Sequence, residues 1–545
     1  MQAHVSLAAA IGCASFALVG GARAQCPPLT QTVYAADVGD DRSFGVSVAF
    51  DSAASSLLVG AETDDAPAND CGATYVFRSQ GGAWTMLAKL QAADASATAR
   101  FGHDVDVSAN GTIASIGAVG DDALAADAGA VYVFADSGGA WHQVAKLVAS
   151  DHDAGDAFGR SVALNADGTL AVIGASDDDL GGVDAGAAYV WVDPGFGWIE
   201  AQKLVPPAGS AGWRFGSGVD ASASGDVLAI GARGGDRVLV YRRIGSLWKF
   251  ETTLVASFAV SNLGKVVELD ASGDVVLAGA SFTNSFAGNA ALWRRSGGAW
   301  GAAVELAASP PKANDFFGSA VALDASGTRA VVGAFGDATS IGGSTHVFEF
   351  DGASWSVTAV LASSASAVDG GTSVACSADG RSIASGDPLG ALGNGLVDVH
   401  RFVDAPVGYC TAKPNSLGCT PTLAFSGCPS ATSGSGFVVT ASQVLSQKQG
   451  VFFYGTSGAQ AVPFQGGWLC AHGPLKRIAL QSSGGHPPPS DCSGSFTVDF
   501  NAHAASGSDP ALVAGAAFAG QWWSRDPAAS FGTSLTGAVR GTLGP

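Results

Sequence analysis

A unit of 48 to 57 residues recurs seven times between residues 30 and 402, and this repetition constrains the fold more than any other feature. Each unit opens on a Phe-Gly pair or its equivalent and later reaches a Gly-Ala pair or its equivalent. The openings stand at Phe44, Phe101, Phe158, Phe215, Leu263, Phe317 and Gly370. A period of this length indicates a repeat architecture in which every unit is one supersecondary element.

Each unit reads as four short strands. An apolar alternation follows Phe-Gly, a tight Asp/Asn/Gly turn leads into a second apolar run, and a third run is β-branched and aromatic, as in the one that ends at Phe134. The fourth strand carries a tryptophan. Such runs and turns are typical of antiparallel hairpins. The sequence therefore predicts an all-β chain with a seven-bladed β-propeller of four-stranded blades.

The Phe-Gly…Gly-Ala spacing resembles the FG-GAP repeat, the blade unit of integrin α-chain heads and of many secreted bacterial proteins. The resemblance covers roughly residues 30–402 and implies a propeller with a role in recognition or adhesion. Calcium-binding members carry an Asp-x-Asp-x-Asp-Gly loop between the first two strands. Here that place holds only tight turns at 165–168, 270–273 and 324–327, so the usual calcium site of the family is not inherited.

The ends of the repeat region predict how the ring closes. The seventh unit supplies three strands that end at Phe402, and no strand with a tryptophan follows. Residues 29–37 resemble the end of a fourth strand, so we expect them to complete blade seven. Such a closure would join the two ends of the ring and remove exposed sheet edges. The propeller is predicted to span residues 25–405.

The N-terminus has the composition of an export signal. An apolar stretch precedes Ala22-Arg23-Ala24, a small-x-small cleavage pattern, so residues 1–24 are predicted to be a signal peptide. No later segment approaches an uninterrupted apolar run of the length that spans a bilayer. We therefore expect a secreted or cell-surface protein without membrane insertion.

Residues 406–545 are predicted to form a second, small β-sandwich-like domain. They resemble a C-terminal module of many secreted bacterial proteins. Five of the nine cysteines lie there, and export favours disulfides. The predicted pairs are Cys410–Cys419 and Cys470–Cys492. The sequence leaves the partners of the remaining cysteines open: Cys26, Cys71, Cys376 and Cys428.

The net charge of −20 belongs to the repeat region, because the chain from Cys410 onward has six basic and four acidic residues. Aspartates gather in the loops between second and third strands and in the loops that enter the next blade. Both kinds of loop emerge on one face of a propeller. An acidic face disfavours nucleic acid and anionic membranes as partners.

The loops of blade three concentrate these carboxylates. Calcium requires six to eight oxygen ligands, and clustered carboxylates with backbone carbonyls supply them. Ca²⁺ is thus the one cofactor that the sequence suggests. The alternative is a hydrated acidic surface that keeps a secreted protein monomeric. The candidate ligands are Asp151, Asp153, Asp156, Asp177, Asp178, Asp179 and Asp184.

The remaining signals bear on function. A tryptophan recurs at one place in six units, where it would either stack on sugars or pack blade against blade. The sequence has no Gly-x-Ser-x-Gly, His-Glu-x-x-His or Gly-x-x-x-x-Gly-Lys motif. We therefore expect a non-catalytic recognition or adhesion protein that binds an extracellular protein or glycan. The alternatives are a carbohydrate-binding or carbohydrate-active propeller and a structural component of the cell surface or matrix.

Overall fold

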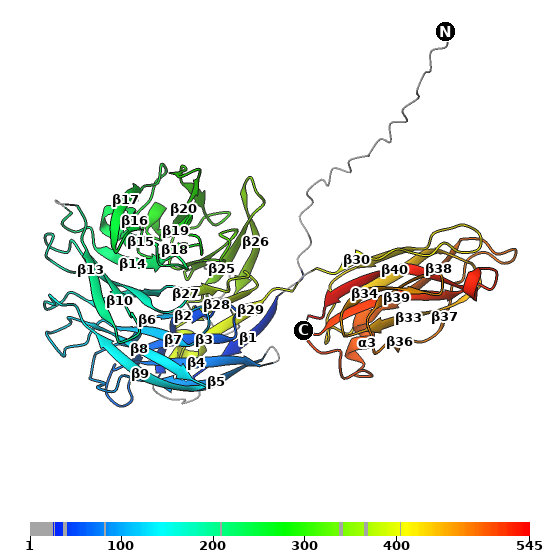
Figure 1. The fold of residues 1–545 in the computed structure, drawn as a ribbon, viewed down its shortest axis with the longest axis horizontal. Coiled ribbons are helices and arrows are strands. Elements are labelled where there is room, and N and C mark those ends of the chain that lie inside the picture. The colour runs from blue at the N-terminus through cyan, green and yellow to red at the C-terminus, as the bar shows by residue number, and fades with distance from the viewer. Residues whose placement is uncertain are drawn as a thin grey trace, which may run out of the picture. The chain divides into compact units, whose positions relative to one another are not determined.

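The computed structural model divides the chain into two compact units, residues 28–403 and residues 404–544 together with the segment that ends at residue 27 (Figure 1). The residues that it describes are 26, 28–35, 41–80, 83–207, 210–336, 342–363, 369–403 and 405–544.

The first unit consists of seven antiparallel sheets that follow one another along the chain. Blade 1 is β2 (Asp41–Phe50), β3 (Ser56–Asp64), β4 (Ala73–Gln80) and β5 (Ala83–Leu90). Blade 2 is β6 (Phe101–Val107), β7 (Ile113–Ala118), β8 (Ala130–Ser137) and β9 (Ala140–Leu147). Blade 3 is β10 (Phe158–Leu164), β11 (Leu170–Ala175), β12 (Ala187–Val192) and β13 (Ile199–Leu204). Blade 4 is β14 (Phe215–Ala221), β15 (Val227–Ala232), the short helix η1 (Arg233–Gly235), β16 (Arg237–Ile244) and β17 (Leu247–Leu254).

The remaining blades repeat this order with small irregularities. Blade 5 is β18 (Val267–Leu269), β19 (Val275–Ala280), α1 (Thr283–Phe286), β20 (Asn289–Ser296), β21 (Ala299–Trp300) and β22 (Val304–Leu306). Blade 6 is β23 (Val321–Leu323), β24 (Arg329–Ala334), β25 (Ser344–Phe350) and β26 (Trp355–Ala362). Blade 7 is β27 (Ser373–Cys376), β28 (Ser382–Asp387), α2 (Gly390–Gly393), β29 (Leu396–Arg401) and β1 (Leu29–Val33). The predicted propeller of four-stranded blades is confirmed.

The two glycines of the repeat motif explain its spacing, because they touch across adjacent blades. A Cβ added to Gly117 of blade 2 would lie 2.1 Å from the carbonyl oxygen of Gly159 in blade 3. Gly159 itself has φ +90°, a conformation that favours glycine. The same contact joins Gly60 to Gly102, Gly174 to Gly216, Gly231 to Gly264, Gly279 to Gly318, Gly333 to Gly371 and Gly386 to Gly45. The last pair brings blade 7 against blade 1.

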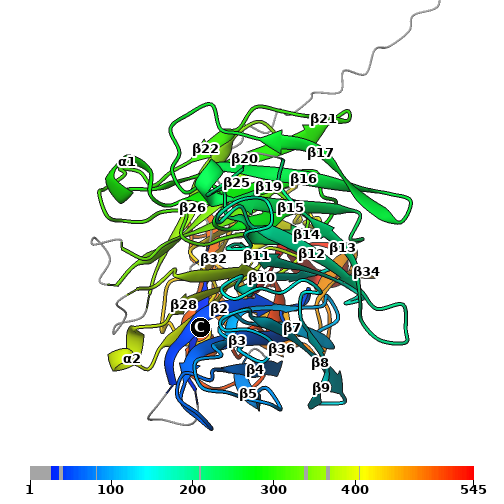
Figure 2. The same ribbon diagram turned by 90° about the vertical axis from the view of Figure 1, so that its left-hand side faces the viewer.

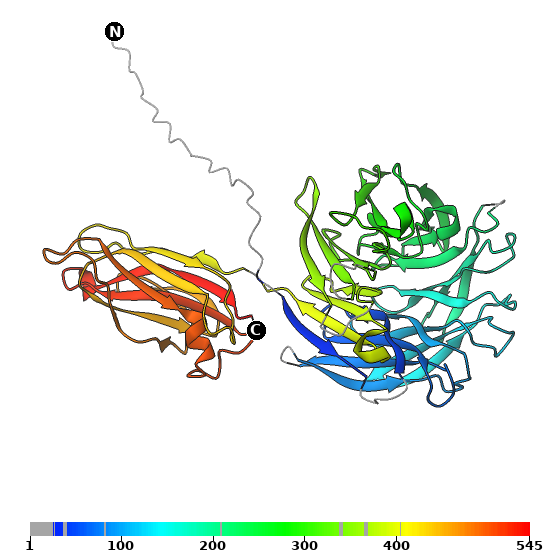
Figure 3. The same ribbon diagram turned by 180° about the vertical axis from the view of Figure 1, so that it is seen from behind.

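Strand β1 is the outer strand of blade 7 and pairs with β29 from Leu29↔Arg401 to Val33↔Val397 (Figures 1 and 3). Thr32 donates a hydrogen bond to Asp398 at 2.6 Å within this pair. Gln31 reaches the next blade, where its side chain accepts from the N–H of Trp84 at 2.8 Å and donates to the carbonyl oxygen of Trp84 at 2.9 Å. Residues 36 and 37, the end of the predicted strand, lie outside the described residues.

Aromatic side chains pack against one another within the blades. The phenylalanine that opens a unit is fully buried and meets the tyrosine of the third strand edge to face, as Phe101 meets Tyr132 at a ring-centroid distance of 5.4 Å. Such pairs add to the stabilisation that comes from burying apolar area. In the five units that open on phenylalanine, this side chain therefore anchors the first strand to its own blade.

The second unit packs two sheets around a shared core. One sheet contains β30 (Val407–Tyr409), β33 (Gln449–Gly455), β36 (Lys476–Arg477), β37 (Gln481–Ser482), β39 (Ala517–Arg525) and β40 (Thr533–Thr542). The other contains β31 (Thr422–Ser426), β32 (Val438–Val444) and β38 (Gly494–Asp499). A hairpin of β34 (Ala459–Phe464) and β35 (Gly467–Ala471), the helix α3 (Phe500–Ala505) and the turn η2 (Ser530–Gly532) complete the unit. Phe437, Phe452 and Trp522 belong to the core that both sheets enclose, which confirms the sandwich-like fold.

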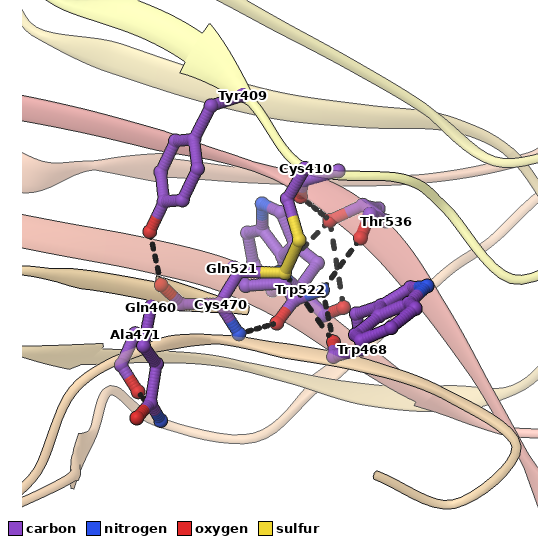
Figure 4. The surroundings of a disulfide bond; sticks show 10 residues. Tyr409, Cys410, Gln460, Trp468, Cys470, Ala471, Gln521, Trp522 and Thr536 are labelled. Carbon is purple, nitrogen blue, oxygen red and sulfur yellow. Dashed lines mark hydrogen bonds between the residues drawn. A yellow bond between two sulfur atoms is a disulfide. The ribbon is translucent and has the colours of Figure 1, made fainter. Parts of the chain in front are cut away.

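The disulfides connect the predicted cysteines in a different pattern. Cys410 pairs with Cys470 and Cys419 pairs with Cys492, so both predicted pairings are wrong. The reason is the strand order. Cys410 directly follows β30, and Cys470 lies on β35. Tyr409 of β30 donates a hydrogen bond to the carbonyl oxygen of Cys470, which places the two cysteines side by side (Figure 4).

Beside this disulfide, the buried Gln521 accepts from the N–H of Cys470 at 3.2 Å and donates to the carbonyl oxygens of Trp468 and Thr536 at 3.1 and 2.6 Å (Figure 4). A third disulfide joins Cys26 to Cys428. Cys71 and Cys376 are free, and Cys71 is buried.

Candidate functional site

A cavity of about 380 Å³ lies at the centre of the ring, lined by the first strands of all seven blades. The residue directly after each Phe-Gly opening or its equivalent, such as Arg160 after Phe158-Gly159, marks one end of this cavity. The end where the second-to-third and fourth-to-first loops emerge is called the loop face here. Figure 2 shows α1 and α2, which lie in two second-to-third loops, on the same side of the ring.

Three cationic side chains meet at the loop-face end of the cavity, and we call them the basic mouth. Arg160 on β10, Arg233 in η1 and Lys265 just before β18 come from blades 3, 4 and 5. All three are at least partly buried. In the described chain, no hydrogen bond or ion pair joins any of these side chains to an acceptor, and Arg233 Nε is fully buried without a partner.

The electrostatics of the basic mouth agree with this lack of partners. Burial lowers the pKa of Lys265, and the charges of Arg160 and Arg233 lower it further. Burial also lowers the pKa of Arg233, together with the charges of Arg160 and Arg214, and these effects outweigh the charges of Asp177 and Asp184, which raise it. A cation that gains an anionic partner on folding would instead have a raised pKa. The basic mouth is therefore a region of unsatisfied positive charge.

The carboxylates nearest to the basic mouth hold other cations. Asp177 and Asp184 accept from Arg214 at 2.7 and 3.4 Å. Glu62 contacts His103, which also lines the cavity, at 2.6 Å. Burial raises the pKa of Glu62, but the hydrogen bond and charge of His103 and the nearby arginines hold it below its ordinary value.

Four carboxyl groups line the cavity on or beside the first strands of blades 2, 4 and 5, and we call Asp104, Asp106, Asp220 and Glu268 the acidic tier. Asp104 and Asp106 accept from the N–H groups of Val162 and Leu164 on β10 at 2.8 and 2.6 Å. Asp220 accepts from Leu269 N–H at 2.5 Å, and Glu268 is hydrogen-bonded to the backbone of Leu323. Each carboxyl group thus satisfies a backbone N–H group of the next blade, which would otherwise be buried without a partner.

Burial is the largest cause of raised pKa values in the acidic tier. It raises the pKa of Asp104 to about 6 and that of Asp106 to about 7. The pKa of Asp220 rises to about 8 through burial and the charges of Asp106 and Asp270. That of Glu268 rises well above its ordinary value through burial and the charges of the three aspartates. The tier can therefore gain and lose protons near neutral pH.

Neither group of cavity residues was identified from the sequence. Their signal is the register of the repeats. Arg160 and Lys265 directly follow the opening pairs of their units, at the position that Val46 occupies in the first unit. Asp106, Asp220 and Glu268 share a place three residues further on. A charge on the otherwise apolar innermost strand of a repeat marks the central cavity.

Six of the seven aspartates predicted to bind calcium accept from protein groups through their carboxylates, and Asp153 contributes its N–H. Lys203 contacts Asp151 at 2.7 Å and Asp178 at 2.6 Å, and Arg214 contacts Asp177 and Asp184. Asp156 accepts from the N–H of Asp153, and Asp179 accepts from the N–H of Asp184, both at 2.7 Å. Within the described ranges, no group of three or more His, Cys, Asp or Glu side chains is arranged to hold a metal ion. Calcium binding stays a prediction.

Blade 3 repeats a network that is also present in blade 2. Tyr189 donates to Asp151 at 2.8 Å and Asp178 at 3.1 Å, and Lys203 lies 5.0 Å from the centre of the Tyr189 ring. In blade 2 the equivalent residues are Tyr132, Asp94, Asp121 and Lys146. Each lysine balances one of the two negative charges of its aspartate pair, and the network ties the loop that enters a blade to the loop that follows its second strand.

The recurring tryptophans pack within the propeller. Trp84 lies 5.7 Å from Phe50 and Trp355 lies 5.5 Å from Phe350, between ring centroids. Trp248 is 2% exposed, and its Nε1 donates to the carbonyl oxygen of Gly225. None of the six is classed as exposed: Trp84, Trp141, Trp198, Trp248, Trp300 and Trp355. Their position favours packing over sugar stacking.

Four phenylalanines form an exposed cluster on the loop face over blades 5 and 6, and we call them the phenylalanine cluster. Measured between ring centroids, Phe286 lies 5.4 Å from Phe282 and 5.3 Å from Phe316. Phe316 in turn stacks on Phe335 at 4.6 Å. Phe282 is 47% exposed and Phe286 is 42% exposed. Phe286 and Phe316 have left-handed φ values of 64° and 51°, which are uncommon for bulky residues.

The three disulfides indicate an oxidising compartment such as the extracellular space. In the part of the chain that the structure describes, we find no helix with the length and apolar character needed to span a bilayer.

Comparison with known proteins places the repeat. Residues 84–134, 141–191 and 300–348 match the FG-GAP repeat family. Hydrazine synthase of Kuenenia stuttgartiensis is 13% identical, with a TM-score of 0.47 over 68% of this chain and 98% of that chain. The WD40 repeats of RRP9 are 12% identical, with a TM-score of 0.46 over 69% of this chain and 99% of that chain. Among curated proteins none matches. The matched repeats and the glycine contacts between blades together identify the repeat region as an FG-GAP β-propeller.

Proposed function

We propose that this protein is an exported, non-catalytic recognition protein that binds an extracellular protein or glycan on the loop face of its propeller. The observation that carries this proposal is the phenylalanine cluster. Its rings contact one another in a folded patch, yet two of them remain nearly half exposed. An exposed aromatic patch costs solvation free energy and is typical of a binding surface.

The backbone around the cluster supports the proposal. Asn284, Ser285, Phe286 and Phe316 all have left-handed φ values. Residues in such conformations cost free energy and concentrate at binding sites, where the surrounding structure holds them in place. Here they hold the exposed rings of Phe282 and Phe286 above the loops of blade 5.

The experiment compares the full chain with Phe282→Ser and Phe286→Ser in two assays, a glycan array and capture of extracellular proteins from the organism's own surface extract. Loss of a captured ligand in both variants, with an unchanged melting temperature, supports the proposal. The control is Phe196→Ser, because Phe196 is 81% exposed on the hairpin between β12 and β13, away from the cluster. Equal binding by all four proteins would contradict it.

A carbohydrate-active propeller is the second candidate, and the acidic tier is the observation that favours it. Carboxyl groups with pKa values near neutrality in a cavity are typical of general acids and bases. Release of reducing ends from a polysaccharide panel, abolished by Asp220→Asn, would establish this activity. The hydrogen bond from Leu269 to Asp220 gives the carboxyl group a structural role, so the recognition function is preferred.

A further inference from the structure

We propose that the basic mouth is a binding site for a tetrahedral oxyanion, the sulfate or phosphate group of a ligand that reaches the cavity from the loop face. This inference deepens the recognition function proposed above, because it names the chemistry of one group of the ligand. It concerns Arg160, Arg233 and Lys265, which are distinct from the phenylalanine cluster.

The lack of partners carries the first step. The protein has a net charge of −20, and partly buried cations elsewhere on the loop face, such as Lys203 and Arg214, hold carboxylates. The three cations of the basic mouth form no such pair in the described structure, and Arg233 Nε has no acceptor. A buried charged donor without an acceptor is costly, so the geometry calls for an anion that is supplied from outside.

The arrangement of the three cations selects the class of anion. They come from three consecutive blades and line one cavity, so their donors converge from different directions. A carboxylate presents two coplanar oxygens, which a single guanidinium can satisfy. A sulfate or phosphate group presents three or more oxygens in different directions, which two guanidinium groups and one ammonium group can share.

The cavity also limits how deep a charged ligand can reach. Asp106, Asp220 and Glu268 of the acidic tier lie three residues further along the first strands than the mouth position, roughly 10 Å on an extended chain, and Asp104 lies one residue further. A second negative group would meet these carboxyl groups inside the cavity. We therefore expect the oxyanion to occupy the mouth, with the rest of the ligand outside on the loop face.

The test uses the full chain and inorganic sulfate, inorganic phosphate and acetate, each at the same ionic strength as a sodium chloride reference. Sulfate or phosphate should raise the melting temperature above the chloride value and bind in a calorimetric titration, and the tighter of the two names the group. Arg233→Gln and Lys265→Gln should each weaken this binding at least about ten-fold, because each removes a charge-assisted hydrogen bond. Lys249→Gln is the matched control, since Lys249 is exposed on the outer strand β17.

In buffer without the oxyanion, Arg233→Gln and Lys265→Gln should melt at or above the temperature of the unaltered protein, because each removes an unpaired cation. Four results would overturn the proposal: equal effects of sulfate, phosphate and chloride, acetate binding as strong as sulfate binding, a loss of affinity in Lys249→Gln, or a lower melting temperature of the mouth variants without the anion. The titration uses inorganic anions only. Failure of the phenylalanine variants to lose a partner would therefore leave this result unaffected.

Discussion

The N–H of Leu164 donates a hydrogen bond to Asp106 Oδ2 at 2.6 Å and thereby joins blade 2 to blade 3 inside the ring. The same carboxyl group has a pKa of about 7, because burial disfavours its charged form and Asp104 adds to the effect. Asp220 and Glu268 face the same cavity with raised pKa values. The propeller therefore binds protons that the unfolded chain releases.

This difference gives the first prediction, a loss of stability as the pH rises. A carboxyl group whose pKa is raised on folding costs nothing below its unfolded pKa near 4 and costs most above its folded pKa. We expect Asp106→Asn to lie within about 1 kcal/mol of the unaltered protein at pH 4.5 and to exceed its free energy of unfolding at pH 8.5 by about 4 kcal/mol, because an amide can still accept from Leu164. Urea unfolding at both pH values measures the change.

The control for this prediction is Asp226→Asn, which changes the charge equally at an exposed position. It should show no stabilisation that grows between the two pH values. If the difference in the free energy of unfolding between Asp106→Asn and the unaltered protein is the same at both pH values, the pKa of Asp106 is not raised on folding.

The second prediction concerns the lysine of the blade 3 network. Lys203→Met leaves the buried Asp178 without its cation, although Tyr189 still donates to it. Breaking a buried ion pair from one side costs about 3 kcal/mol. We expect a loss of this size in urea unfolding, whereas the exposed replacement Lys249→Met should change stability by less than about 0.5 kcal/mol. Similar small losses in both variants would mean that the network adds little.

Calcium provides the third prediction and addresses the ion suggested by the sequence. Any calcium that binds Asp151 and Asp178 must displace Lys203, so the lysine and the metal compete for the same oxygens. We expect millimolar calcium to raise the melting temperature of Lys203→Met more than that of the unaltered protein, with sodium chloride at equal ionic strength as the reference. An equal calcium-specific rise in both proteins would place the ion elsewhere.

The repeat period contained enough information for the propeller, because the glycines that define it are the residues that touch between blades. Gly117 and Gly159 cannot be replaced without a backbone clash, so their spacing records the geometry of the ring. Loop aspartates carry no such record. Whether Asp178 binds a metal ion or Lys203 depends on where β13 places the lysine. The two residues are 25 positions apart, and no local sequence pattern indicates that they are in contact.

The disulfides and the cavity show the same limit. Cys410 and Cys419 are close in sequence, but the strand order sends the first to Cys470 and the second to Cys492. Arg233 lies in a loop between strands, outside the repeated motif, and only the curvature of the ring brings it beside Lys265. Contacts between distant strands set the chemistry here, and no local pattern encodes them.

The fourth prediction tests ring closure at a single side chain. Gln31 on β1 makes two hydrogen bonds with the backbone of Trp84 in blade 1, and Gln202 makes the same two bonds with Trp248 between blades 3 and 4. We expect Gln31→Leu and Gln202→Leu each to cost about 1–2 kcal/mol in urea unfolding, because each leaves backbone groups of the next blade without a partner. A loss in Gln202→Leu alone would show that the hydrogen bonds of Gln31 do not stabilise the contact between blade 7 and blade 1.

The last prediction concerns the disulfide that spans the propeller sequence. Cys26 precedes the first strand of the propeller, and Cys428 lies in the second unit. The propeller sequence is therefore connected to the second unit twice, by the peptide bond after Val403 and by the Cys26–Cys428 disulfide. After cleavage at a protease site inserted between residues 403 and 404, the two fragments should stay joined on a non-reducing gel and separate when reductant is added. Cys428→Ser should release them without reductant, and the control is Cys376→Ser, which removes a free cysteine. Separation of the unaltered protein without reductant would contradict the pairing.

A soluble, β-rich fragment after reduction would support an independently folding propeller, because each unit has its own core.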